Sequence, residues 1–259
     1  MIRGRSSAND RDARRESIAR SLMSHGARRI DDIAEEYDVS PMTIYRDIDY
    51  LSSQGVARRD RGFATALVAS MSEVSTTIRM NQNVETKKRL GSAAANLITG
   101  RDVVAIDEST TSIFALDAMA DSPPATVITY SHTALQRASK LEGVSVVFCG
   151  GDYRPQVDAC VGQTTVEEIS KVYADVAIVS VTAVKNGACL HADEEIADVK
   201  RAMLSNAGRR ILIIDRTKFG RTALHHVVDL AEFTDIVTEP TTHVDFSEVQ
   251  DRGVKVHTF

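Results

Sequence analysis

Four polar segments in the C-terminal two-thirds of the chain each follow a run of apolar, β-branched residues. They are Asp107-Glu108-Ser109-Thr110-Thr111, Tyr130-Ser131-His132, Cys149-Gly150-Gly151 and Asp215-Arg216-Thr217-Lys218. Hydroxyls and free backbone N–H groups at a helix start suit an oxyanion such as phosphate, paired glycines permit close backbone approach, and a lysine adds positive charge. Each segment alone is more typical of an ordinary cap, turn or solvated lysine. The four together predict an anion pocket.

The segments between these loops alternate between helical patterns and short β-branched runs. The pattern predicts strands at 103–106, 126–129, 144–148, 176–181, 211–214 and 235–237, and helices at 86–98, 110–119, 133–141 and 193–207. Apolar runs without polar alternation indicate strands covered on both faces, hence a doubly wound, mostly parallel α/β domain. In such sheets ligands bind beyond the C-terminal strand ends, where all four polar segments fall.

The first sixty residues have a different, helical character. Helices are predicted at 11–24 and 31–37, and a third begins with Ser40 as its cap and Pro41 in its first turn. The spacing of Ile44, Ile48 and Leu51 predicts the buried stripe of this third helix. On the same geometry Met42, Thr43 and Arg46 point away from the core. Tyr45 lies on the flank of the helix.

Two short strands, at 56–59 and 63–64, are predicted around the turn Asp60-Arg61-Gly62. A short helix, a tight turn, a capped helix and a small hairpin form the arrangement that places side chains in the major groove of DNA. Double-stranded DNA is therefore the predicted partner of residues 1–64, a winged helix-turn-helix. The predicted contacts are Ser40, Met42, Thr43, Tyr45 and Arg46 from the helix, with Arg58, Arg59 and Arg61 from the hairpin. Residues 65–78 are predicted to be a connector, packed partly as a strand.

The net charge of -5 seems unsuited to a DNA-binding protein until it is divided along the chain. Residues 1–64 hold 12 Arg and 11 acidic residues, a net of +1, which leaves 19 basic and 25 acidic residues, a net of -6, for the remainder. The arginines also cluster, at positions 3, 5, 11, 14 and 15, at 28 and 29, and at 58, 59 and 61. One arginine-rich face is enough to neutralise several phosphates, although composition alone also permits a solvated surface.

Residues 14–64 resemble the helix-turn-helix of the DeoR family. The resemblance rests on Asp32-Ile33-Ala34, Val39-Ser40 and Thr43-Ile44-Tyr45-Arg46-Asp47-Ile48, in which Tyr45 takes the place of a family arginine. Asp38 stands where the family turn has glycine, a position that favours left-handed φ. The resemblance implies an operator sequence that differs from those of relatives with the arginine.

Residues 79–259 resemble the DeoR sensor domain, which implies a fold related to ribose-phosphate isomerase, the CoA transferases and sugar-phosphate deaminases. The landmarks are Arg79 and Lys87, the loops 107–111 and 129–131, the run Gly150-Gly151-Asp152-Tyr153-Arg154, and the segment 215–220. In the family these loops hold a phosphorylated sugar or related metabolite, whose binding releases the operator. The effector-binding residues that this implies are Lys87, Asp107, Glu108, Ser109, Thr110, Thr111, Thr129, Ser131, Gly150, Gly151, Arg154 and Lys218.

Three departures from the family pattern lie at this pocket. Ser109 replaces a glycine, Tyr130 replaces an asparagine, and Glu108 adds a carboxylate beside the expected anion. A negative charge there is unfavourable unless it points away or binds a sugar hydroxyl. We therefore expect an effector other than a common hexose phosphate.

Three classes of function are compatible with these patterns. The two modules favour a repressor of a carbohydrate-catabolism operon. The acid-base groups Asp107, Glu108 and Lys218 would suit a sugar-phosphate isomerase or deaminase. Only the lack of a strong catalytic motif favours a scaffold. No cofactor or metal is expected, and Cys149, Cys160 and Cys189 are interpreted as small buried hydrophobic residues. We find no signal peptide or membrane segment, which favours the cytoplasm, and paired half-sites imply a homodimer or homotetramer.

Overall fold

A computed structural model describes residues 11, 14–15, 17–19, 21–22, 27–53, 56–66 and 76–259. The chain divides into two compact units, Met1–Ile78 and Arg79–Phe259. Arg3, Arg5 and most of the expected connector, residues 67–75, lie outside the described residues, as does the predicted end of the first helix at 23–24. No helix in the described ranges is both long and apolar enough to cross a membrane.

The N-terminal unit is a helix-turn-helix followed by a hairpin, as the sequence predicts. The described residues between 11 and 22 are helical, and they precede α2 (Ile30–Glu36), α3 (Pro41–Ser53), β2 (Ala57–Asp60) and β3 (Phe63–Ala66). Its core is made of residues from all three helices and the hairpin, among them Ile18, Leu22, Ile33, Ile44, Ile48, Leu51, Val56 and Ala64. The predicted stripe of α3 is therefore its buried face.

A third strand, β1 (Arg28–Arg29), was missed in the sequence. It pairs antiparallel with β3, Arg28 opposite Ala64 and Arg29 opposite Phe63, giving the sheet order β1-β3-β2. Two arginines before a helix carry no strand signal of their own, because a strand this short exists only through its partner.

The second unit is built on a seven-stranded sheet in which every neighbouring pair is parallel. The strands, in the spatial order β15-β14-β12-β9-β4-β5-β6, are Lys255–Thr258, Asp235–Thr238, Ala207–Ile214, Ala174–Val179, Val103–Ile106, Thr126–Thr129 and Ser145–Phe148. The chain runs outward from β4 through β5 to β6, then returns to β9 on the other side of β4. The order therefore reverses between β4 and β9, which is where ligands bind in open α/β sheets.

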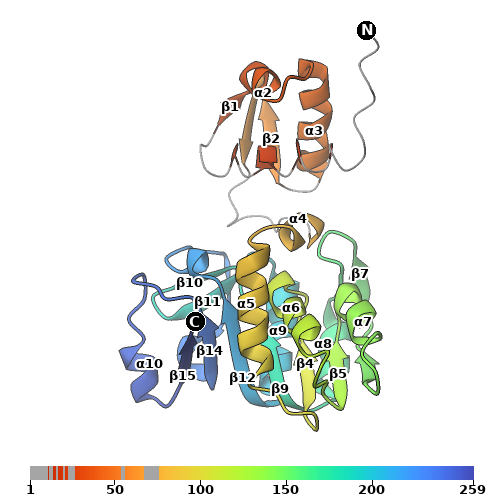
Figure 1. Cartoon of the computed structure of the whole chain (residues 1–259), viewed down its shortest axis with the longest axis vertical. Coiled ribbons are helices and arrows are strands. Elements are labelled where there is room, and N and C mark those ends of the chain that lie inside the picture. Colours follow the sequence, from red (N-terminus) through yellow and green to blue (C-terminus); the bar gives the residue numbers. More distant parts are fainter. Residues whose placement is uncertain are drawn as a thin grey trace. The chain divides into compact units, whose positions relative to one another are not determined.

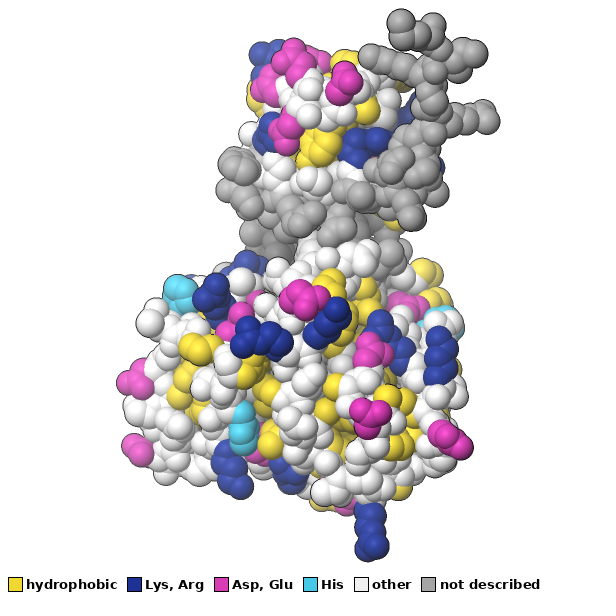
Figure 2. Space-filling model, in the orientation of Figure 1, with side chains coloured by type: hydrophobic (Ala, Val, Ile, Leu, Met, Phe, Trp, Pro, Cys, Tyr) yellow, Lys and Arg dark blue, Asp and Glu magenta, His cyan; other side chains and the backbone are white. Residues whose placement is uncertain are grey.

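Helices cover both faces of this sheet, which confirms the doubly wound fold (Figure 1). One core lies under α5 (Val84–Ala95), α6 (Thr110–Ala118) and α7 (His132–Ala138), and the other under α8 (Gln163–Ser170) and α9 (Glu194–Ser205). Adjacent residues of each strand serve opposite cores: Ile211 and Ile213 belong to the first, Leu212 and Ile214 to the second. Figure 2 shows basic and acidic side chains intermingled over the drawn face of this unit.

The helix pair α5 and α6 packs closely because Gly91 has no side chain. A Cβ at Gly91 would lie 2.7 Å from the backbone of Phe114 in α6. Since α5 carries Lys87 and α6 begins at the polar loop 107–111, this close packing brings two of the predicted site segments together.

Several short elements around the sheet are not predicted by the sequence. They are α4 (Thr76–Met80), the hairpin β7 (Asp152–Arg154) and β8 (Ala159–Val161), the small sheet β10 (Ala183–Lys185), β11 (Ala188–His191) and β13 (His225–Asp229), the 3-10 turns η1 (Arg216–Lys218) and η2 (Leu230–Glu232), and α10 (Ser247–Asp251). The missed helix α8 and strand β15 belong to the main layers. Most of these are too short for periodicity to reveal, since they depend on partners elsewhere in the chain.

Candidate functional site

Helix α3 presents the side chains that the sequence assigns to DNA. The Ser40 hydroxyl accepts the N–H of Thr43 at 3.2 Å, so the predicted cap is formed, and Asp38 before it has φ 48°, as the turn requires. Met42 is 62% exposed and Arg46 is exposed, whereas Thr43 and Tyr45 are half-buried. The outward face of α3 therefore carries one cation and one apolar side chain, a combination suited to base edges.

Two of the clustered arginines have an internal role instead of the phosphate-facing one expected from the sequence. The Nε atoms of Arg14 and Arg15 each donate to a different carboxylate oxygen of Asp47, both at 2.8 Å, and Asp47 is 1% exposed. The guanidinium of Arg15 also lies 3.9 Å from the centre of the Tyr50 ring. These contacts fix the first helix against α3. The expectation that Arg14 and Arg15 belong to the phosphate-neutralising face is therefore wrong.

The hairpin keeps its arginines at the surface. Arg58, Arg59 and Arg61 are all exposed, and the turn between β2 and β3 has positive φ at Arg61 (44°) and Gly62 (85°), the twist that two-residue hairpins favour. Arg59 lies 3.6 Å from Asp49 and stacks on Tyr45, with its guanidinium 5.1 Å from the ring centre. Tyr45, the departure from the family pattern, thus links α3 to the hairpin.

In the second unit, the polar loop after β4 is buried at the point where the strand order reverses. One carboxylate oxygen of Asp107 accepts the N–H of Ser109 at 3.1 Å, and the other accepts the N–H of Ser180, at the end of β9, at 2.8 Å. The Ser109 hydroxyl accepts the N–H of Ser112 and so caps α6. Asp107 therefore joins the ends of the two central strands and is 0% exposed.

Lys200 of α9 is the counter-ion of this loop and was missed in the sequence. Its ammonium donates to Asp107 and, at 2.9 Å, to Glu108, and it is fully buried. Burial alone lowers the pKa of Lys200, but the Asp107 and Glu108 carboxylates outweigh it and raise the pKa overall. The ammonium in turn helps to hold the pKa of Asp107 below its usual value despite burial.

Glu108 and Tyr130, two of the residues that depart from the family pattern, contact each other. The Tyr130 hydroxyl donates to the same Glu108 oxygen that Lys200 contacts, and His191 lies 3.9 Å from the other oxygen. All four side chains are at most 2% exposed. Burial, followed by the neighbouring Glu108 and Asp107 carboxylates, raises the pKa of Tyr130 well above 10, which keeps it a neutral donor. Glu108 therefore points into the fold and not toward a bound anion.

Two lysines form the cationic part of the site. Lys218 in η1 donates to the carbonyl of Val181 at 2.8 Å and lies 3.2 Å from the Ser180 hydroxyl, so it reaches the end of β9. Lys87 in α5 is 6% exposed and donates to the backbone carbonyl of Arg79. Burial, and then the positive charges of Lys218 and Arg79, lower the pKa of Lys87 to about 7. The three cations are therefore close enough to repel one another, and a bound anion would relieve that repulsion.

The remaining predicted residues have internal partners. Thr129 donates to the carbonyl of Ile106 at 2.8 Å, and the Ser131 hydroxyl accepts the N–H of Ala134 as the cap of α7. Thr110 and Thr111 are buried in the first turn of α6. Arg154 pairs with Asp193 and Glu195 at the start of α9.

The two glycines of the third loop differ in what they require. A Cβ at Gly151 would lie 2.0 Å from the Thr165 hydroxyl oxygen, whereas a Cβ at Gly150 would meet nothing within 4 Å. Gly151 is therefore needed for packing against α8. Gly150 has open space in front of its backbone, which a ligand could occupy.

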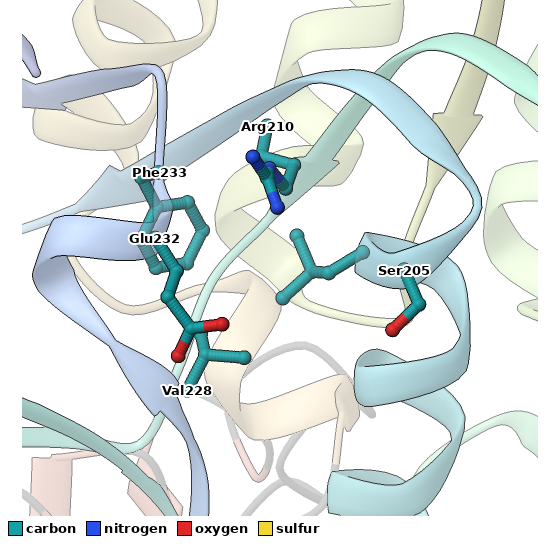
Figure 3. Close-up of a pocket in the computed structure, with 6 residues that line it drawn as sticks. Ser205, Arg210, Val228, Glu232 and Phe233 are labelled. Carbon is teal, nitrogen blue, oxygen red and sulfur yellow. The ribbon is translucent and has the colours of Figure 1, made fainter.

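No candidate metal site is found in the described part of the chain, and the hollow near the end of α9 is small. No group of three His, Cys, Asp or Glu side chains in the described ranges could hold a metal ion, and the three cysteines are buried and unpaired with one another. A hollow of about 30 Å³ lies between the end of α9 and η2, lined by Leu204, Ser205, Arg210, Val228, Glu232 and Phe233 (Figure 3). This volume holds a water molecule or two and is too small for a metabolite.

The comparisons with known proteins agree with these two units. Residues 14–69 match the DeoR-like helix-turn-helix domain, and residues 82–240 match the DeoR C terminal sensor domain. The chain belongs to the DeoR family. The matched domains are regulatory ones, so this DeoR-family chain is a DNA-binding transcriptional regulator and not an enzyme.

The chain is also similar to curated transcriptional regulators over most of its length. It is 27% identical to the putative aga operon transcriptional repressor of Escherichia coli O157:H7, over 94% of this chain and 92% of the relative. It is 24% identical to the glycerol-3-phosphate regulon repressor of Escherichia coli K12, over 91% and 94% of the two chains. Among solved structures, ribose 5 phosphate isomerase A from Neisseria gonorrhoeae is 14% identical, covers 56% of this chain with 55% of its own, and gives a TM-score of 0.39.

Replacing Asp47 tests the internal role of Arg14 and Arg15. Asp47→Ala should lower the free energy of unfolding of the N-terminal unit by about 3 kcal/mol, because it leaves two part-buried arginines without their carboxylate. Asp49→Ala is the matched control: this exposed carboxylate lies 3.6 Å from Arg59, and its loss should change stability by less than ~0.5 kcal/mol. Denaturant unfolding followed by circular dichroism measures both, and equal losses would contradict the assignment.

Replacing Lys200 tests the buried charge cluster. Lys200→Met should destabilise the sensor unit by about 3 to 5 kcal/mol, since Asp107 and Glu108 would stay buried without their counter-ion. The deficit should shrink as pH falls from 8 to 5, because protonating a carboxylate removes the uncompensated charge. Adding Glu108→Gln should recover part of the loss, whereas Lys171→Met, at an exposed surface pair, should have little effect. A deficit that does not depend on pH would argue against this electrostatic origin.

Proposed function

We propose that this chain is a repressor of a carbohydrate-catabolism operon that leaves its operator when the sensor unit binds a phosphorylated sugar or a related metabolite. The observation that carries the proposal is a buried lysine, Lys87, whose ammonium donates to the backbone of Arg79 and whose pKa is lowered by burial and by the charges of Lys218 and Arg79. Lys218 itself reaches the end of β9. Its relatives are named for the aga operon and the glycerol-3-phosphate regulon, which supports a sugar or polyol phosphate as the effector class.

The DNA contacts are assigned to the exposed face of α3 and to the hairpin. Arg46 and Met42 are placed to meet base edges, with Ser40, Thr43 and Tyr45 at the flanks of the same helix. Arg58, Arg59 and Arg61 are exposed on the hairpin and are assigned to phosphates. Because two half-sites one helical turn apart require two such units, we assign the active form to a homodimer or homotetramer.

The phosphate of the effector is assigned to Lys87 and Lys218 together with the backbone N–H groups of Thr110 and Thr111 at the start of α6. Ser109, whose N–H donates to Asp107 and whose hydroxyl caps α6, is assigned a positioning role. The first N–H groups of a helix have no partner within the helix, and the helix dipole favours an anion there. Gly150 offers open backbone for the rest of the ligand, with Thr129 and Ser131 on the neighbouring strand end. The side chains of Asp107, Glu108 and Arg154 are satisfied internally, and Gly151 is needed for close packing, which supports a positioning role for these four residues.

The signal is proposed to leave the pocket through α4. The ammonium of Lys87 donates to the carbonyl of Arg79, and α4 directly follows the connector to the DNA-binding unit. A phosphate that takes hydrogen bonds from Lys87 competes with that carbonyl. Effector binding would therefore loosen the end of α4 and alter the connector, without any new contact to DNA.

Replacing Arg46 tests the DNA assignment. Arg46→Ala should weaken binding to the chain's own promoter region by about 1 to 3 kcal/mol and affect random DNA much less, if the guanidinium contacts a base. Arg221→Ala, in an exposed stretch of the sensor unit, is the control that should not change DNA affinity. Fluorescence anisotropy titration gives both affinities and the number of chains per operator. Equal losses on specific and random DNA would assign Arg46 to phosphate only.

The pH dependence of ligand binding tests the role of Lys87. Its pKa is about 7 in the free protein, and a bound phosphate would raise that pKa by favouring the ammonium. Above pH 7, binding must therefore take up a proton, and the affinity for glycerol 3-phosphate or inorganic phosphate should fall by up to about tenfold per pH unit. Below pH 6 the phosphate itself becomes less charged, so the tightest binding is expected near pH 6 to 7.

Calorimetry at pH 8 in two buffers of different ionisation enthalpy measures the proton uptake directly. Lys87→Met should abolish both the binding and the uptake. Lys88→Met is the matched control, because Lys88 is its exposed neighbour and pairs with Glu85. Binding that is unchanged in Lys87→Met would remove this residue from the site, and the failure of any phosphate ester to bind the wild-type protein would refute the effector class.

A further inference from the structure

The outward face of α3 carries three exposed side chains in one line. Met42, Arg46 and Asp49 are all exposed, and their spacing of four and then three residues puts them on the same side of the helix. At a rise of about 1.5 Å per residue the line is about 10 Å long, which matches roughly three base-pair steps of about 3.4 Å. An α-helix fits into the major groove of DNA, so this line can lie along the edges of neighbouring base pairs.

The acidic end of this line contacts the hairpin. The Asp49 carboxylate lies 3.6 Å from the Arg59 guanidinium, which also stacks on the Tyr45 ring, 5.1 Å from its centre. A carboxylate that faced DNA without a cation beside it would repel the phosphates. Asp49 and Tyr45 are thus used in contacts with the hairpin arginine, which leaves the first half of the line, Met42 and Arg46, to contact bases.

Met42 supplies an apolar contact at the start of the line. The neighbouring Thr43 hydroxyl lies 2.9 Å from the Ser40 hydroxyl, so both hydroxyls already have a partner in the helix cap. Met42 is 62% exposed, and its thioether sulfur is only a weak hydrogen-bond acceptor. In the major groove the apolar feature of the base edges is the C5-methyl group of thymine. An exposed apolar side chain at this position therefore fits thymine better than any of the other three bases.

Arg46 sets the distance to the neighbouring contact. Among the described residues its guanidinium makes no hydrogen bond or ion pair, and its paired donors match the O6 and N7 atoms of guanine. Met42 and Arg46 are four residues apart, which is about 6 Å along the helix axis or roughly two base-pair steps. We propose that each operator half-site contains a thymine whose methyl group packs against Met42, about two base pairs from the guanine that Arg46 binds. The inference rests on the proposed function and adds base identities and a spacing to it.

A base analogue that lacks one methyl group tests this on the full-length protein. Deoxyuridine in place of thymidine removes only the C5-methyl group, so each thymine of the promoter duplex is replaced in turn and the affinity is measured by fluorescence anisotropy. At one thymine per half-site the replacement should weaken binding of the wild type about fourfold, the effect expected from burying one methyl group. Met42→Ala should lose the sensitivity to this replacement, because the side chain that contacts the methyl group is gone. Arg46→Ala should bind more weakly overall but keep the sensitivity.

Met42→Leu is the conservative variant: it keeps an apolar side chain and should keep the sensitivity. Met42 is exposed, so neither of its substitutions should affect folding, which circular dichroism checks. The spacing is tested with 7-deazaguanine, which lacks the N7 acceptor and should have no effect in Arg46→Ala at the guanine that Arg46 binds. A sensitive thymine more than about three base pairs from that guanine would contradict the spacing.

The outcomes separate this inference from the proposed function. If no thymine is coupled to Met42, or if Met42→Ala weakens operator and random DNA equally, the inference is overturned while the base contact of Arg46 stands. If the full-length protein does not distinguish its promoter region from random DNA, the proposed function fails as well.

Discussion

The sensor unit depends on one buried ion cluster, in which the Lys200 ammonium neutralises Asp107 and Glu108 where the strand order reverses. Charges removed from water are tolerated only when paired and hydrogen-bonded, and here Ser180, Ser109 and Tyr130 complete the set. Because these partners come from the ends of β4, β5 and β9 and from α9, the cluster fixes the relative positions of the loops above it. Ser180 also contacts Lys218, so the proposed ligand-binding lysine is aligned by the same network.

This network explains why a carboxylate is compatible with an anion site. The sequence places Glu108 where a phosphate is expected, and its charge would oppose binding if it faced the pocket. Lys200 and Tyr130 hold it inside the fold, so the carboxylate is neutralised beside the capped start of α6. Glu108 and Tyr130 are therefore a matched pair of substitutions relative to the family pattern, not two independent ones.

The spacing of apolar residues predicts those elements whose buried residues all lie within one short segment of the chain. Strands β4 and β5 have the bounds expected at 103–106 and 126–129, and the stripe Ile44, Ile48 and Leu51 is buried. What could not be predicted are charges that lie on buried stripes. Asp47 and Lys200 each fall on the apolar face of a helix, and their partners are 33 and 93 residues away. A pattern within one helix cannot show whether such a charge is paired, so the sequence does not reveal that Arg14 and Arg15 are part-buried against Asp47.

Communication between the two units requires that the effector bind two states of the protein with different affinity, since a ligand with equal affinity for both shifts nothing. In the proposed function, Lys87 meets that requirement because its ammonium can donate hydrogen bonds either to the chain or to the ligand. In the free protein it donates to Arg79 at the end of α4, while burial and neighbouring cations lower its pKa to about 7. A bound phosphate would remove the electrostatic penalty on the charged form of Lys87, and its oxygens would be better hydrogen-bond acceptors than the backbone carbonyl. In the proposed function, ligand binding relieves the repulsion between the cations of the empty pocket. The free energy released in this way drives the change at the connector.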